Sequence, residues 1–148
     1  KAMSTSPLPA ALLGTFKHTK NDGFDDYLAS KGVPWIIRKM ILISSHVIMI
    51  SASADGTSFS FHNTMGSRQI NYDGVRLGEQ IEANGYDGKK HKIVFTLDDG
   101  VLSQKLEPLE AASGTEVYTY SIKDDVFIQK MDNGKKTCQR FYRREASK

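Results

Sequence analysis

Seven Asp-Gly or Asn-Gly dipeptides interrupt this chain at short intervals, and they restrict its fold more than any other feature. Glycine adopts positive φ without steric cost, and Asn and Asp tolerate it, so such pairs between apolar runs are strong β-hairpin signals. The pairs are Asp22-Gly23, Asp55-Gly56, Asp73-Gly74, Asn84-Gly85, Asp87-Gly88, Asp99-Gly100 and Asn133-Gly134. We therefore expect an antiparallel meander whose strands are joined by short turns.

The segments between these turns alternate apolar and polar residues. In residues 57–62, for example, Phe occupies one face and Ser or His the other, which is the period of a half-buried strand. This pattern predicts ten strands, at residues 12–19, 44–51, 57–63, 68–72, 79–83, 92–97, 101–106, 116–122, 126–131 and 137–144.

The segment from Phe24 to Leu42 breaks the alternation and predicts two short helices. Apolar residues in its first half follow helical spacing, and Gly32 can end the first helix in a left-handed conformation. Pro34 can open the second helix, which is apolar around most of its circumference. Ten meander strands with one helical hairpin after the first predict an all-β fold in which the sheet closes on itself.

The chain has the size and composition of one globular domain, with 148 residues of which 39% are hydrophobic. Folding at this length buries roughly 68 to 70% of the unfolded surface, enough for a core or a cavity without disulfides. We expect a flexible N-terminal segment at residues 1–11 and one β-barrel domain at residues 12–148. The apolar runs fall short of the ~20 residues that a membrane span requires.

The sequence offers little for catalysis. Its four histidines lack metal-ligand spacing, its single cysteine, Cys138, has no neighbouring base, and no glycine-rich phosphate loop is present. We expect no catalytic residue, no metal site, no cofactor and no enzymatic activity.

Residues 137–144 are the most informative strand, because their alternation places Cys138, Arg140 and Tyr142 on one face. A guanidinium inside a barrel is costly to desolvate unless an anion or ordered water meets it, so an inward Arg140 predicts an anionic guest or a water network. Alternatively the strand is a basic, exposed edge with Phe141 buried. The pattern alone leaves both open.

Residues 135–148 carry a net charge of +5, which we interpret as a solvated strand and not a nucleic-acid site.

Several motifs resemble the fatty-acid-binding proteins, the intracellular-type lipid-binding family. The resemblance rests on Leu13-Gly14-Thr15-Phe16-Lys17, Gly23-Phe24-Asp25-Asp26-Tyr27-Leu28, Gly32-Val33, Arg38 and Cys138-x-Arg140-x-Tyr142, and it extends from about Leu12 to Glu145. It implies a calycin-like, ten-stranded antiparallel up-and-down β-barrel of two orthogonal sheets, with a helix-turn-helix lid after the first strand. It also implies noncatalytic binding and transport of a long-chain fatty acid in an internal cavity.

The resemblance assigns the ligand carboxylate to Arg140 and Tyr142. Tyr120 stands where many members have a second interior arginine, and a phenol donates one hydrogen bond without a charge, so it is a candidate third contact. This departure keeps a retinoid or another small apolar ligand open as the alternative. His18, where an aliphatic residue is expected, is interpreted as a surface group. The implied cavity and portal lining is Phe24, Tyr27, Val33, Ile37, Gln104, Leu106, Gln129 and Met131.

Within the family, the chain is most similar to the secreted nematode subclass. This implies an extracellular, monomeric protein without its signal peptide, with a cytoplasmic location as the alternative. Trp35 and Ile36 of the apolar second helix could contact a membrane transiently, with Lys31 and Lys39 near anionic head groups. Packing of these apolar residues on the barrel rim is the competing interpretation.

Overall fold

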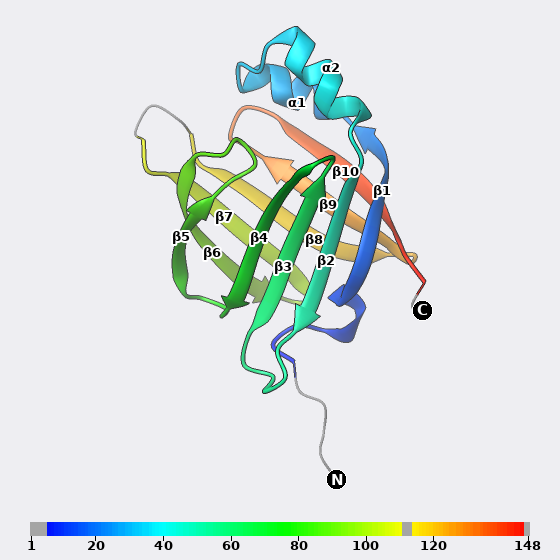
Figure 1. Ribbon diagram of the computed structural model, residues 1–148, viewed down its shortest axis with the longest axis vertical. Helices are drawn as coiled ribbons and strands as arrows, with labels where there is room; N and C mark the ends of the chain where they lie inside the picture. The colour runs from blue at the N-terminus through cyan, green and yellow to red at the C-terminus, as the bar shows by residue number, and fades with distance from the viewer. Residues whose placement is uncertain (1–5, 111–113, 147–148) are drawn as a thin grey trace.

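A computed structural model describes residues 6–110 and 114–146 of the chain. All ten predicted strands are present, and they form one antiparallel sheet in the order β4-β3-β2-β1-β10-β9-β8-β7-β6-β5. The sheet curves into a barrel that is nearly closed, with β4 and β5 as its edges (Figure 1). The strands are β1 (Gly14–Asp22), β2 (His46–Ala52), β3 (Phe59–Met65), β4 (Arg68–Val75), β5 (Gln80–Asn84), β6 (Lys90–Asp98), β7 (Val101–Pro108), β8 (Glu116–Lys123), β9 (Val126–Asp132) and β10 (Thr137–Arg144).

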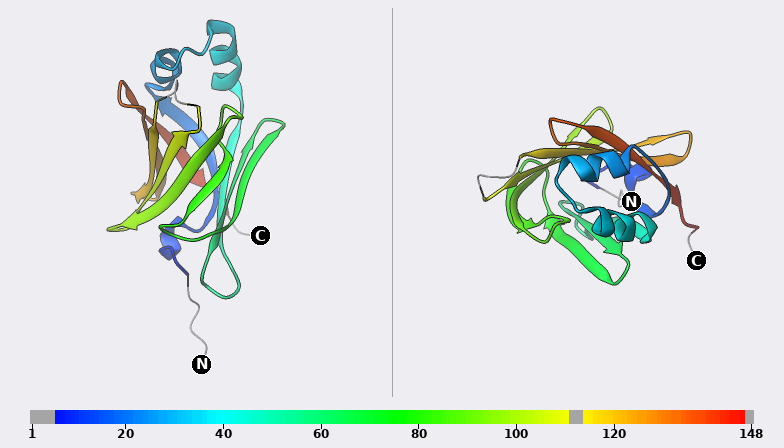
Figure 2. Two further views of the ribbon diagram at one scale, coloured as in Figure 1. Left: turned by 90° about the vertical axis from the view of Figure 1, so that its left-hand side faces the viewer. Right: turned by 90° about the horizontal axis from the view of Figure 1, so that it is seen from above.

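Two helices, α1 (Phe24–Ser30) and α2 (Trp35–Ile43), follow β1 and cover one end of the barrel, as seen from above in Figure 2. Gly23 precedes α1 with a φ of 78°, a left-handed conformation that glycine adopts freely. The predicted helical pair is therefore confirmed. Neither helix combines the length and the hydropathy that a membrane span needs in the part of the chain described.

The Asp-Gly and Asn-Gly pairs form turns or element ends with one exception. Asp73-Gly74 was expected to be a turn, but it lies inside β4, where Phe61 pairs with Tyr72 while Phe59 pairs with Val75. The extra residue is a β-bulge, which Gly74 permits because its φ is 63°. The prediction of a turn was wrong because the same positive φ serves turns and bulges.

The barrel core consists of inward side chains from alternate strand positions, dominated by aromatic rings. Phe16 and Phe127 stack at 4.1 Å between ring centroids, for example. At the end opposite the helices, a 3-10 helix (Ala10–Leu12) precedes β1, and both Leu8 and Leu12 belong to the buried core. The division of the chain at residue 12 stays a prediction, and residues 1–5 lie outside the described part.

Candidate ligand-binding site

A cavity of about 250 Å³ lies beneath the helices at the covered end of the barrel. Its wall carries the cationic side chains of Lys31, Arg68 and Arg140, and no Asp or Glu among the residues that the structure describes. The remaining lining is largely apolar and aromatic, and comprises Phe24, Tyr27, Leu28, Ile37, Met40, Ile41, Ser44, Ser45, His46, Met65, Tyr86, Tyr118 and Met131. A concave, apolar site with a few charged groups suits an amphiphilic anion.

Arg140 projects from β10 into this interior and is only 5% exposed. Its Nε donates a hydrogen bond to Asn21 Oδ1 at 2.9 Å, and its Nη1 contacts His46 Nδ1 at 2.9 Å. The guanidinium carbon also lies 4.1 Å from the centroid of the Phe24 ring. Within residues 6–110 and 114–146, no carboxylate forms an ion pair with Arg140. The buried charge is therefore held by neutral partners.

Tyr142, two residues further along β10, is fully buried on the same face. Its hydroxyl donates to Gln129 Oε1 at 2.8 Å and also lies 2.8 Å from His46 Nδ1. Burial raises the pKa of Tyr142, so the phenol is neutral. The structure thus adopts the inward alternative for Arg140 and Tyr142, and their contact with a carboxylate stays a prediction.

Tyr120 joins the same network farther from Arg140, beyond Gln129 and Tyr142. Its hydroxyl donates to Gln104 Oε1 at 2.6 Å and accepts from Gln129 Nε2 at 3.2 Å. Burial raises the pKa of Tyr120 well above its ordinary value, so this phenol is also neutral. Tyr120 therefore reaches Tyr142 through Gln129.

His46, at the start of β2, is a buried polar residue of this site that was not predicted from the sequence. It is 2% exposed, and its Nε2 lies 3.0 Å from Asn63 Oδ1. Because arginine can only donate, Nδ1 is the acceptor and the proton is assigned to Nε2. Burial and then the charge of Arg140 lower the pKa of His46 to about 3, so the imidazole is neutral. The signal was available, since His46 shares the inward face of its strand with Ile48 and Ile50.

His18, expected on the surface, is half-buried on β1. Its Nε2 lies 2.6 Å from Asn21 Oδ1, the atom that also accepts from Arg140. Burial and the charge of Arg140 lower the pKa of His18. The side chain therefore supports the residue that orients the guanidinium.

The predicted lining residues are divided among several locations. Phe24, Tyr27, Ile37 and Met131 lie on the cavity wall. Gln104, Leu106 and Gln129 are buried in the barrel interior. Val33 lines a separate polar pocket beside the α1–α2 connection. No group of three or more His, Cys, Asp and Glu residues could hold a metal ion in the described ranges.

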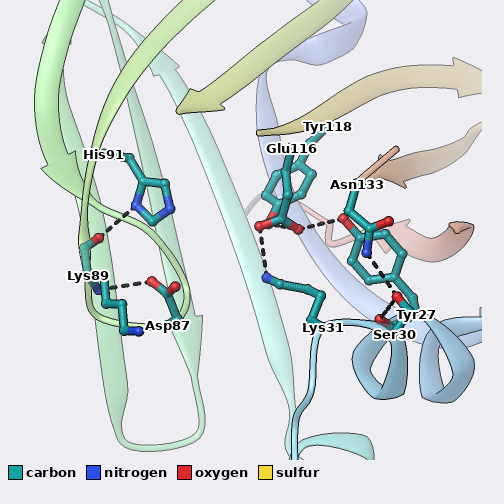
Figure 3. A network of polar contacts seen from close by, with 9 residues as sticks. All are labelled: Tyr27, Ser30, Lys31, Asp87, Lys89, His91, Glu116, Tyr118 and Asn133. Atoms are coloured by element: carbon teal, nitrogen blue, oxygen red, sulfur yellow. Dashed lines mark hydrogen bonds and ion pairs between the residues drawn. The ribbon is translucent and has the colours of Figure 1, made fainter. Parts of the chain in front are cut away.

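Lys31 lines both this polar pocket and the main cavity, and an ion pair holds it in place. Its Nζ lies 2.8 Å from Oε2 of Glu116 on β8. Oε1 of Glu116 accepts from the Tyr27 hydroxyl at 2.5 Å and from the Tyr118 hydroxyl at 3.1 Å. Figure 3 shows this cluster, with His91 on the far side of the pocket. The cluster ties α1 to the barrel, and the sequence analysis did not identify Glu116.

The second helix contributes part of the cavity wall but buries none of its residues fully. Trp35 is 61% exposed and Ile43 86% exposed, and Ile36 and Met40 are also exposed. A helix that leaves this much apolar surface exposed has an unpartnered apolar face.

The chain is 32% identical to fatty acid-binding protein homolog 3 of Caenorhabditis elegans, over 99% of this chain and 90% of the relative. Among solved structures, it is similar to As-p18, an extracellular fatty acid binding protein, with a TM-score of 0.86 and 27% identity over 96% and 100% of the two chains. The fatty acid binding protein of Schistosoma mansoni, in complex with arachidonic acid, has the same fold, with a TM-score of 0.81 and 19% identity over 93% and 98%. No protein-family model matches the chain.

Proposed function

The chain belongs to the fatty-acid-binding protein family, and on that premise we propose that it is a noncatalytic carrier of a long-chain fatty acid, whose carboxylate binds Arg140 and Tyr142. The supporting observation is the burial of the Arg140 charge among neutral partners. A carboxylate would supply the missing counter-charge, and it could form charge-assisted hydrogen bonds with the donors that Arg140 has not used.

The energetics of burial agree with a carrier. Burying ~16 methylenes at ~0.8 kcal/mol each contributes about 13 kcal/mol before the costs of ordering the ligand chain are subtracted. Submicromolar binding follows. Most of the affinity comes from the tail, and Arg140 selects acids over neutral lipids. We assign Tyr120 a positioning role, because its hydroxyl bonds Gln104 and Gln129, whereas the Tyr142 hydroxyl lies beside the same His46 nitrogen as Arg140.

Displacement of a fluorescent fatty acid tests this function directly. Oleate should displace the probe at a stoichiometry near one to one, and methyl oleate should compete more weakly. Failure of every long-chain acid to compete would contradict the proposal. Retinoic acid and retinol distinguish the alternative ligand class, since tighter competition by retinol than by oleate would identify a carrier of neutral retinoids.

We further propose that α2 contacts membranes during ligand transfer. Its exposed apolar residues, Trp35, Ile36, Met40 and Ile43, suit insertion at a bilayer surface, and Lys39 lies on the same helix to meet anionic head groups. The cavity wall includes Ile37, Met40 and Ile41 of this helix, so a membrane contact would occur beside the ligand.

We place the protein outside the cell, as a monomer. The support for the location is the similarity to As-p18, an extracellular fatty acid binding protein. Immunoblotting of medium and cells that express the complete natural gene product tests this location, and retention in the cells would favour the cytoplasmic alternative. Light scattering of the purified protein tests the monomer, which a mass of two chains would contradict.

A further inference from the structure

We propose that His46 belongs to the anion site, and that an anionic head group binds together with one proton, which Nδ1 of this histidine carries. The inference rests on the proposed function, because an anion has to occupy the site beside Arg140. It adds a residue and a proton to the Arg140 and Tyr142 contact.

The geometry of Nδ1 is the starting point. This nitrogen lies 2.9 Å from Arg140 Nη1 and 2.8 Å from the Tyr142 hydroxyl. These are the two groups to which we assign the ligand carboxylate. His46 Nδ1 is therefore an acceptor at the place where a ligand oxygen would bind.

Binding of an anion exchanges the hydrogen bond between Arg140 and His46. The contact from Arg140 Nη1–H to Nδ1 breaks, and a contact from the same N–H to the ligand oxygen forms. The lone pair of Nδ1 would then face an anionic oxygen. Uptake of one proton from solvent onto Nδ1 replaces this repulsion with an N–H···O hydrogen bond. Nε2 keeps its own proton and its contact with Asn63.

The charges around His46 decide when the proton binds. Arg140 and Tyr142 face it from β10, and the Tyr86 ring lies edge-on at 5.6 Å from the connection between β5 and β6. His18 on β1 acts on it through its charge, and Lys31 and Arg68 share the cavity wall. Burial and the charge of Arg140 disfavour a proton on His46, and His18 adds to this when it is protonated. A bound anion offsets the charge of Arg140 and thereby favours the imidazolium.

The sign of the pH dependence follows from linkage. Because the complex holds one proton more than the free protein, affinity increases as pH falls, by up to about tenfold for each pH unit. A ligand that remains ionised isolates this effect, since a fatty acid has its own titration. Hexadecanesulfonate provides such a head group with a comparable tail.

Titration calorimetry with hexadecanesulfonate, between about pH 5 and pH 8 where histidines titrate, measures the effect. Two buffers of different ionisation enthalpy report the protons taken up. We expect uptake that approaches one proton and affinity that rises toward acid. His46→Gln should still bind the sulfonate, because the amide can accept from Arg140 and donate to Asn63. Its binding should take up no proton, and its affinity should not depend on pH. His62→Gln is the control, because this histidine on β3 contacts Asp73 and does not line the cavity, and it should retain both.

The possible failures are distinguishable. If neither oleate nor hexadecanesulfonate binds at any pH, the proposed function itself fails. If the sulfonate binds without proton uptake, or if uptake survives in His46→Gln, the role of His46 is refuted. Should that variant not fold, the imidazole ¹⁵N chemical shifts of the unmodified protein show whether Nδ1 of His46 is protonated in the complex. A protonated Nδ1 in the complex supports the inference, and an unchanged Nδ1 overturns it.

Discussion

The Tyr27 hydroxyl donates a hydrogen bond of 2.5 Å to the Glu116 carboxylate, across 89 residues of sequence. Tyr27 lies on α1 and Glu116 begins β8, so this contact attaches the lid to the barrel (Figure 3). Lys31 and Tyr118 complete the hydrogen bonding of the carboxylate. Opening of the lid at α1 would leave this buried carboxylate without Tyr27 and Lys31, and only Tyr118 of its own strand would remain.

Glu116→Gln is therefore expected to loosen α1. The variant keeps the shape of the side chain but removes the charge, and hydrogen bonds to charged groups contribute about 1.5 to 3 kcal/mol. We expect the free energy of unfolding to fall by a similar amount and the amides of α1 to exchange faster with solvent. Urea unfolding and hydrogen exchange measure both. Glu107→Gln, an exposed glutamate on the adjacent β7, is the control, and equal exchange in the two variants would contradict the role of Glu116.

Arg140→Leu should separate recognition of the head group from burial of the tail. Loss of a charged contact of roughly 1.5 to 3 kcal/mol weakens binding of a free fatty acid about 10- to 100-fold. The methyl ester should bind nearly as before. Competition assays with oleate and methyl oleate measure the difference, and an equal loss for both would show that Arg140 does not bind the carboxylate.

The same variant should be at least as stable as the parent protein without ligand. Removing the guanidinium removes its desolvation cost, and both of its partners keep another contact. Asn21 Oδ1 still meets His18, and His46 Nδ1 still meets the Tyr142 hydroxyl. Chemical unfolding tests this, and a loss of several kcal/mol would indicate that Arg140 is a structural residue.

The double variant Trp35→Ser, Ile36→Ser should transfer a fluorescent fatty acid to anionic vesicles more slowly, because α2 would lose apolar surface that inserts into the bilayer. Equilibrium affinity should change less. Met49→Ser is the matched control, because Met49 is exposed on β2 and away from the helix. Transfer rates that match the parent, and that do not depend on vesicle concentration, would favour diffusion through water and assign these residues to rim packing.

Acid should destabilise the ligand-free protein through His46. Its pKa is lowered to about 3 in the folded state, from 6.5, mainly by burial. The unfolded chain therefore binds more protons between these values. The stabilisation is present above about pH 6.5 and is lost as pH falls, by up to about 1.4 kcal/mol for each pH unit. Urea unfolding at several pH values should show a shallower dependence in His46→Gln, and an identical dependence would refute this assignment.

The sequence by itself determined the number of strands, the position of the helical pair and the face that Arg140 shares with Tyr142. These features depend on local rules, because positive φ at glycine marks chain reversals and a period of two assigns side chains to faces. For β10, the pattern left open whether the face with Arg140 and Tyr142 points into the barrel or toward solvent. Local rules also limited the interpretation of Asp73-Gly74, since turns and bulges use the same backbone conformation.

The tertiary structure decided which distant side chains meet. Arg140 contacts His46 across 94 residues, and Glu116 contacts Lys31 across 85. A spacing pattern carries no information on such pairs, because closure of the barrel and docking of the lid bring them together. The protonation state of His46 follows from the same cause. Burial and a neighbouring charge shift the pKa of His46, and both exist only after the strands have enclosed it.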